Sequence, residues 1–224
     1  MKKLLLSFVF ANIISLANSQ WIQTNGPYGG QSVSCFAVSG SVIYAGTNGG
    51  VFVSSNNGDL WSPITNGLPY TQISSLAVSD TNIFIGTWGG VFYSGNNGNT
   101  WKALRNNGLS KNFVTSIVIS DTNIFAGLYE DYFSSSDGVY LSNNNGSSWT
   151  VKNNGLPYID IAAKEYQILG LGVSGSYIFA APRIYGLYVS SNNGDTWTSA
   201  NNGFQCDPNN FSFVTDGTVS FPKS

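Results

Sequence analysis

Carboxylates are the side chains of this 224-residue chain that could support acid–base chemistry. The sequence contains no histidine, which removes imidazole as a general base, as a partner of a nucleophile and as a metal ligand. Serine triads and histidine-based zinc or haem sites are therefore excluded. Two opposed carboxylates about 5 to 10 Å apart can hydrolyse a glycosidic bond. The catalytic candidates are the acidic residues of two neighbouring segments, Glu130, Asp131, Asp160 and Glu165.

A second set of residues is suited to binding. Aromatic rings stack on the CH faces of sugars, and Tyr and Trp also anchor protein partners. The candidate binding residues are Trp88, Tyr129, Tyr132, Tyr185 and Arg183. Tyr70 and Tyr158 lie nearby, but each belongs to a recurring Leu-Pro-Tyr sequence, which favours a packing role for both. We expect the ligand to be a glycan or an extended protein segment.

Composition limits the other partners. Charged residues make up 9% of the chain, and the formal net charge is -2. Such a balance supplies no basic surface for nucleic acid. We expect no nucleic-acid partner, no cofactor and no metal.

The first 19 residues have the three parts of a secretory signal peptide. Lys2 and Lys3 precede an apolar stretch, and Ala17 and Ser19 are small residues before Gln20. A membrane anchor would need about 20 consecutive apolar residues, whereas polar residues interrupt this shorter stretch. We therefore expect a secreted or extracytoplasmic protein, in the periplasm or at the cell surface, with no membrane insertion after cleavage.

The remaining chain is built from a repeat marked by Trp21, Trp61, Trp101, Trp149 and Trp197. Each of the last four tryptophans closes an octapeptide: SSNNGDLW, SGNNGNTW, SNNNGSSW or SSNNGDTW. The expected repeats cover about 21–61, 61–101, 101–149 and 149–197, with a partial unit over 197–224. Each contains four short segments with period-two alternation, bounded by turn residues, which indicates antiparallel strands.

A unit of about 40 residues with four strands is typical of a β-propeller blade. The sequence predicts an all-β domain over 20–224, with four complete blades and a partial fifth. The segments 211–214 and 218–221 match the first two strands of a blade, and Trp21 to Thr24 matches a fourth strand. Either these remnants close a ring of five blades, or the chain is part of a larger ring.

The octapeptides resemble the Asp-box, or BNR, repeat of the sialidase-like, sortilin-like and photosystem II assembly factor-like propellers, whose general form is S-x-D-x-G-x-T-W. Asn replaces the family's Asp in every copy here, and Asn can bond its own backbone two residues on in a tight hairpin. The resemblance implies a structural role, with the Trp packed between blades. The residues that match the motif are Ser54, Asn56, Gly58, Trp61, Ser94, Asn96, Gly98, Trp101, Ser142, Asn144, Gly146, Trp149, Ser190, Asn192, Gly194 and Trp197.

The two insertions in the repeat, 128–138 and 158–167, fall on the face opposite the octapeptides. Insertions on one face of a repeat protein commonly mark its binding face. The favoured function is a secreted, non-catalytic module for binding or assembly. The alternatives are a fragment of an Asp-box glycoside hydrolase, similar to xyloglucanase-type enzymes, and a purely structural surface protein. Sialidase activity is disfavoured, because that family uses three arginines and this chain has only Arg105 and Arg183.

Two smaller features leave alternatives open. Calcium binding by the octapeptide loops is disfavoured, since each offers at most one carboxylate. Cys35 and Cys206 would lie in neighbouring blades of a closed ring, where they could form a disulfide or remain two free thiols.

Cleavage of the signal peptide is testable by intact mass spectrometry of the protein recovered from the secreting cell. We expect a mass that corresponds to a chain beginning at Gln20, because the small residues Ala17 and Ser19 stand at the positions that signal peptidase requires. A chain that retains residues 1–19 would contradict this interpretation.

Overall fold

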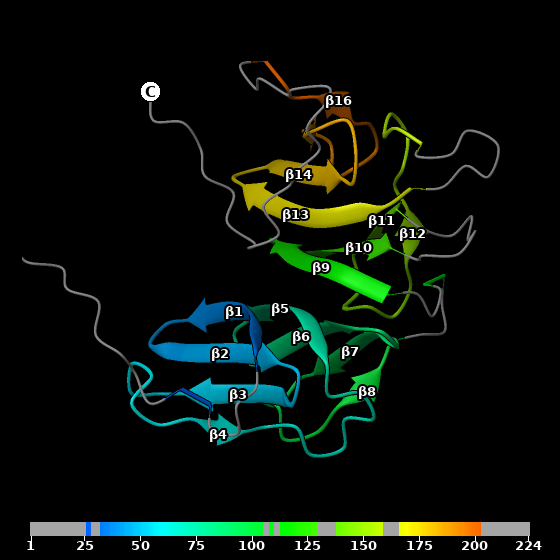
Figure 1. Cartoon of the computed structure of the whole chain (residues 1–224). Coiled ribbons are helices and arrows are strands. Elements are labelled where there is room, and N and C mark those ends of the chain that lie inside the picture. The colour runs from blue at the N-terminus through cyan, green and yellow to red at the C-terminus, as the bar shows by residue number, and fades with distance from the viewer. Residues whose placement is uncertain are drawn as a thin grey trace, which may run out of the picture.

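A computed structural model describes residues 26–27, 32–104, 108–109, 113–129, 138–158 and 166–202. The described residues contain no helix, and their sixteen strands form four antiparallel sheets of four strands each. Figure 1 shows the sheets following one another along the chain, from β1–β4 in blue and cyan to β13–β16 in yellow and orange. This arrangement confirms the expected all-β fold with four blades.

The four blades, numbered 1 to 4 along the chain, have the same strand order. Blade 1 consists of β1 (Val33–Ser39), β2 (Val42–Thr47), β3 (Gly50–Ser54) and β4 (Ser62–Pro63). Blade 2 consists of β5 (Ile73–Ser79), β6 (Asn82–Thr87), β7 (Gly90–Ser94) and β8 (Lys102–Ala103). Blade 3 consists of β9 (Phe113–Ser120), β10 (Asn123–Tyr129), β11 (Gly138–Ser142) and β12 (Thr150–Val151). Blade 4 consists of β13 (Ile168–Ser174), β14 (Tyr177–Pro182), β15 (Tyr188–Ser190) and β16 (Thr198–Ser199). The predicted partial fifth blade lies outside the described residues.

Each octapeptide forms the hairpin between the third and fourth strands of its blade. In blade 1, the Ser54 hydroxyl accepts the Gly58 N–H at 2.9 Å and donates to Oδ1 of Asn56, also at 2.9 Å. The same Oδ1 accepts the Leu60 N–H at 2.9 Å. Equivalent bonds occur in the other three octapeptides. These hairpins are therefore held by neutral amide and hydroxyl groups.

The hairpin geometry corrects one detail of the prediction. The Asn56 side chain bonds the backbone four residues on, whereas two residues on was expected. The left-handed conformation belongs to the next two residues, Asn57 at φ 59° and Gly58 at φ 89°. Asn and Gly are the residues that tolerate positive φ at low cost. Asn57 and Gly58 therefore form the turn, whereas the side chain of Asn56 makes the hydrogen bonds.

Two of the octapeptide tryptophans are hydrogen-bonded to the preceding repeat. The indole N–H of Trp101 donates to the Ile64 carbonyl at 2.8 Å, and that of Trp197 donates to the Lys152 carbonyl at 2.7 Å. Trp149 and Trp197 are buried, as expected, whereas Trp61 and Trp101 are only partly buried. The expected burial is thus incomplete for Trp61 and Trp101, although Trp101 does pack against the apolar cluster between blades 1 and 2. The buried indole nitrogens of Trp61 and Trp149 have no hydrogen-bond partner within the described structure.

Glycines allow the innermost strands to approach the preceding blade. A Cβ at Gly46 would lie 2.7 Å from Cγ2 of Ile73, and one at Gly127 would lie 2.8 Å from Cγ2 of Ile168. A Cβ at Gly86 would lie 2.8 Å from Cγ1 of Val114. Real Cβ atoms do not approach so closely, so each position requires Gly. The first strands consequently pack in the order β1, β5, β9, β13.

Hydroxyl groups link the same strands from blade to blade. The Ser75 hydroxyl accepts the Ile117 N–H at 2.7 Å, and the Ser116 hydroxyl accepts the Leu171 N–H at 2.9 Å. The first strand of each sheet is an edge strand, and its free backbone groups would otherwise be unpaired. Apolar clusters between successive blades complete the packing.

Replacing Gly86 by Ala tests the close approach. We expect Gly86→Ala to lower the free energy of unfolding by about 1–3 kcal/mol, because the added methyl group overpacks against Val114. Gly172→Ala is the matched control: its Cβ would be 3.9 Å from Phe179, and blades 1 and 2 carry Ala at the equivalent positions. Urea unfolding followed by circular dichroism measures the free energy of unfolding of both variants. Equal stability of the two variants would contradict the packing role of Gly86.

The octapeptide of blade 4 offers a second test. We expect Trp197→Ala to cost about 3–5 kcal/mol of stability, because the ring is 3% exposed and its N–H is bonded to Lys152. Asn192→Asp should change stability little, since a carboxylate oxygen can accept the Thr196 N–H as the amide oxygen does. Thermal unfolding compares the variants, and a large loss in Asn192→Asp would show that the amide donor is essential.

Candidate functional site

A depression lies where the innermost strands of all four blades begin. Its volume is about 410 Å³. Its lining consists of Ser34, Gln72, Ile73, Ser74, Trp88, Phe113, Thr115 and Leu169. The walls therefore combine apolar and aromatic side chains with an equal number of hydroxyl and amide side chains, and both kinds of group occur in ligand sites.

Trp88 is the most prominent aromatic side chain at this depression. It occupies the turn between β6 and β7, at the opposite end of β7 from the octapeptide. The ring is 52% exposed and stacks on Phe113, with centroids 4.3 Å apart and planes at 11°. The Thr87 hydroxyl holds this turn, because it donates to the Gly90 carbonyl and accepts the Gly89 N–H. Thr47 makes the same two hydrogen bonds in blade 1, where Asn48 occupies the position of Trp88. Blades 1 and 2 therefore share the same turn, but only the turn of blade 2 carries an aromatic residue.

Tyr129 and Arg183 extend the aromatic surface. The Tyr129 ring meets Phe113 edge to face, at a centroid distance of 6.5 Å and an angle of 80°. The Arg183 guanidinium lies 6.0 Å from the Tyr129 centroid. Its Nη1 donates to the Gln167 side-chain oxygen at 3.0 Å and to the Tyr129 hydroxyl at 3.4 Å. Trp88, Phe113, Tyr129 and Arg183 therefore form a continuous row, referred to below as the aromatic row.

The structure brings three of the candidate binding residues into this row and leaves one apart. Tyr185 is exposed and follows Arg183 in the same loop, yet its ring makes no contact with the aromatic row among the described residues. Its φ of 73° is unusual for a bulky residue, and its carbonyl accepts a hydrogen bond from Asn201 at 2.9 Å. Phe113 and Gln167 were not predicted; a phenylalanine at a strand start looks like an ordinary core residue.

The remaining candidates cannot be placed. Tyr132 and all the acidic candidates, Glu130, Asp131, Asp160 and Glu165, lie outside the described residues. The recurring tyrosines behave as packing residues. Tyr70 packs against Phe92 at a centroid distance of 5.9 Å and fills the space beside Gly89. Tyr158 packs against Tyr166 at 4.7 Å, and burial together with the Tyr158 hydrogen bond raises the pKa of Tyr166.

The described residues include one cysteine, Cys35. Burial raises the pKa of the Cys35 thiol to about 12, although a backbone hydrogen bond with Gly46 lowers it in part. The protonated thiol is a poor nucleophile and metal ligand. Within the described ranges, no group of three Cys, Asp or Glu side chains could hold a metal ion. The same residues contain no helix long and apolar enough to cross a membrane.

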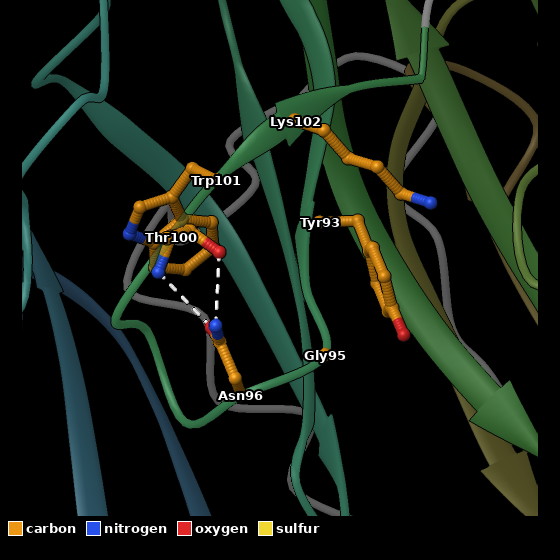
Figure 2. A pocket seen from close by; sticks show the side chains of 6 residues that line it. All are labelled: Tyr93, Gly95, Asn96, Thr100, Trp101 and Lys102. Carbon is orange, nitrogen blue, oxygen red and sulfur yellow. Dashed lines mark hydrogen bonds between the residues drawn. The ribbon is translucent and has the colours of Figure 1, made fainter.

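A second cavity of about 280 Å³ lies beside the octapeptide of blade 2 (Figure 2). Trp101 and Thr100 line one side, and Tyr93 and Lys102 line the other. The polar groups of this cavity already contact one another. Lys102 Nζ lies 4.7 Å from the centroid of the Tyr93 ring. The Asn96 side-chain amide donates to the Thr100 hydroxyl, and its oxygen accepts the Thr100 backbone N–H. The cavity belongs to one blade, whereas the depression gathers residues from all four. We therefore regard the depression and the aromatic row as the candidate site.

Comparisons with known proteins identify the fold alone. No protein-family model and no curated protein matches the chain. Among solved structures, an ancestral GH74 enzyme is 22% identical with a TM-score of 0.61, over 79% of this chain and 25% of that one. The extracellular domain of a hybrid two-component system from B. thetaiotaomicron is 16% identical with a TM-score of 0.62, over 80% of this chain and 23% of that one. The computationally designed Ika4 protein is 10% identical with a TM-score of 0.54, over 75% of this chain and 94% of that one. This chain thus spans about a quarter of the length of the first two of these neighbours.

Proposed function

We propose that this protein is a secreted β-propeller module that binds a glycan or an extended protein segment at the aromatic row and does not turn it over. The observation that carries the proposal is the half-exposed Trp88 ring, stacked on Phe113 at the edge of the depression. Blade 1 forms the same turn with Asn48 in place of Trp88, so the turn itself does not require the aromatic ring. The ring is well suited to contact a ligand.

The aromatic row is organised before a ligand arrives. Trp88 is held by Phe113, and Arg183 is held by Gln167 and Tyr129. Side chains that are already ordered lose little conformational entropy on binding. One face of the Trp88 ring can stack on a sugar or an apolar side chain, while Arg183 supplies a cation and hydrogen-bond donors. Such a surface favours an elongated ligand that crosses more than one blade.

The absence of turnover is proposed from the chemistry of the lining. Among the described residues, those that line the depression supply hydroxyl, amide and apolar groups, and none of them is acidic. Glycoside hydrolysis needs two carboxylates. The alternative, a glycoside hydrolase fragment, has some support: the GH74 neighbours share the fold, and Glu130 follows Tyr129 directly in the sequence. It therefore remains the second candidate.

The cellular setting and the superfamily are part of the same proposal. The N-terminal signal sequence supports an extracytoplasmic protein, as does the likeness to an extracellular domain. The octapeptides have the hydrogen bonds that a structural Asp-box hairpin needs, with Asn56 accepting from both Ser54 and Leu60. We propose that they are Asp-box repeats in which an amide replaces the carboxylate.

A binding experiment with matched variants tests the function. The full chain is applied to immobilised polysaccharides that include xyloglucan, and affinity for any that binds is measured by calorimetry. We expect Trp88→Ala to weaken binding by about 1–3 kcal/mol, because a stacking ring is lost. Tyr177→Ala should leave affinity unchanged: this ring is 51% exposed, close to the 52% of Trp88, but it lies at the end of β14 remote from Arg183.

The outcomes separate the candidates. Equal affinity of Trp88→Ala and the unaltered chain would remove the aromatic row as the site. Release of reducing ends from a bound polysaccharide would favour the hydrolase fragment. Failure to bind any glycan would leave an extended peptide ligand, for which loss of binding in Trp88→Ala on a peptide array is the corresponding measurement.

A further inference from the structure

Asparagine followed by glycine recurs throughout this chain. Such a pair is open to a spontaneous covalent reaction, because the backbone nitrogen of the glycine can attack the side-chain carbonyl carbon of the asparagine, and glycine has no Cβ to hinder the approach. The reaction needs a nitrogen that is free of other bonds and a backbone that can rotate. The folded structure therefore decides which of the pairs can react.

The octapeptide pairs have an occupied nitrogen. In blade 1, Gly58 is buried and its N–H donates to the Ser54 hydroxyl at 2.9 Å. The other three octapeptides make the same bond, at 2.8 or 2.9 Å. In the pair Asn48-Gly49, the Gly49 N–H donates to the Thr47 hydroxyl at 3.0 Å. Attack by any of these nitrogens requires that the turn open first.

The loop from blade 3 to blade 4 contains a pair that its neighbour holds in place. The backbone carbonyl of Asn154 accepts the Trp197 N–H at 2.9 Å, and the Asn154 side-chain amide donates to the Asp195 carbonyl at 3.4 Å. A Cβ at Gly155 would overlap the Trp197 carbonyl oxygen, so this turn lies directly against the blade 4 hairpin. Rotation at this pair would break contacts between two blades.

The equivalent pair between blades 1 and 2 has none of these restraints. A single hydrogen bond closes its turn, from the Leu68 N–H to the Thr65 carbonyl at 3.0 Å. Asn66 and Gly67 are both exposed, and a Cβ at Gly67 would meet no atom within 4 Å. Among the described residues, neither the Gly67 N–H nor the Asn66 side chain has a hydrogen-bond partner. This nitrogen is therefore free, and the turn around it is open.

We propose that Asn66 is a site of spontaneous modification, at which the side chain loses ammonia, takes up water and becomes aspartate or isoaspartate. The free Gly67 nitrogen and the open turn distinguish this pair from the other described pairs, which consist of the same two residues. The proposal concerns the chemistry of this loop, and it holds whether or not the aromatic row binds a glycan.

The reaction needs only water and a base in the solvent. The base removes the Gly67 amide proton, and the nitrogen forms a bond to Cγ of Asn66. The Cγ–Nδ2 bond then breaks as the leaving nitrogen takes a proton from water, which releases ammonia and leaves a cyclic imide. Water adds to either carbonyl carbon of the imide and breaks the bond of that carbon to the nitrogen. Opening at Cγ gives aspartate, and opening at the backbone carbonyl gives isoaspartate.

The product changes the loop that leads to the depression. Either product adds a negative charge, and isoaspartate also adds a carbon atom to the backbone of the turn that ends at Leu68. Leu68 packs against the apolar cluster between blades 1 and 2. Gln72, farther along the same loop, lines the depression. The modification therefore acts on a segment that connects the core to the candidate site.

Ageing of the folded chain tests the proposal. The full chain is kept at mildly alkaline pH below its unfolding temperature, and tandem mass spectrometry of a digest locates each conversion, with an unaged digest as the control. We expect Asn66 to convert at least about tenfold faster than Asn57, Asn97, Asn145 and Asn193, because the hairpins must open before they react. Equal rates would overturn the proposal. An equal advantage of Asn66 in urea would also overturn it, because local sequence would then be the cause.

A variant tests the protection by serine. Ser94→Ala removes the acceptor of the Gly98 N–H. We expect it to speed conversion of Asn97 and to leave Asn145 and Asn193, whose hairpins keep their serines, unchanged. Unchanged conversion of Asn97 would contradict the role of the hydroxyl. If the variant does not fold, hydrogen exchange of the unaltered chain makes the comparison: the Gly67 amide should exchange at least about tenfold faster than the Gly98 amide, and equal exchange would overturn the proposal.

Discussion

The close approach of each innermost strand to the preceding sheet is the constraint on which the rest of the structure depends. Gly46, Gly86 and Gly127 leave no room for a Cβ, and a β-branched side chain of the next blade lies directly over each. This approach brings the Ser75 and Ser116 hydroxyls within reach of the next inner strand, so edge-strand N–H groups are satisfied without a continuous sheet. It also brings the starts of β1, β5, β9 and β13 to one place, where they line the depression.

The two ends of each blade have different physical demands. The octapeptide hairpins need a serine hydroxyl, an asparagine amide and two residues at positive φ, and the four copies meet these demands with the same residues. The opposite turns of blades 1 and 2 are each held by one threonine and by glycines, and the residue after the threonine is Asn48 in one and Trp88 in the other, so this position is free to vary. Trp88 occupies such a free position. The octapeptide hairpins and the proposed binding surface therefore lie at opposite ends of the same strands.

A binding function and a hydrolytic function would use the same surface differently. Stacking on Trp88 and hydrogen bonds from Arg183 need only fixed geometry, which Phe113 and Gln167 provide. Hydrolysis would need a pair of carboxylates across the ligand. The acidic candidates belong to segments adjoining Tyr129 and Tyr166 in the sequence, so either function would involve this face. The solved structures with the same fold include enzymes and an extracellular domain, and the fold alone does not choose between the two functions.

The sequence by itself determined the repeat, the four-stranded units and the octapeptide hairpins, because alternation and turn residues act over a few neighbours along the chain. It also ruled out imidazole chemistry, since no histidine is present. Only the tertiary structure decided that Trp88, Phe113, Tyr129 and Arg183 form one row, because these residues come from three blades and their distances depend on how the blades pack. It likewise decided that Trp197 is buried whereas Trp101 is partly exposed, although both close near-identical octapeptides. Burial depends on what the neighbouring blade places over a ring, and local sequence does not carry that information.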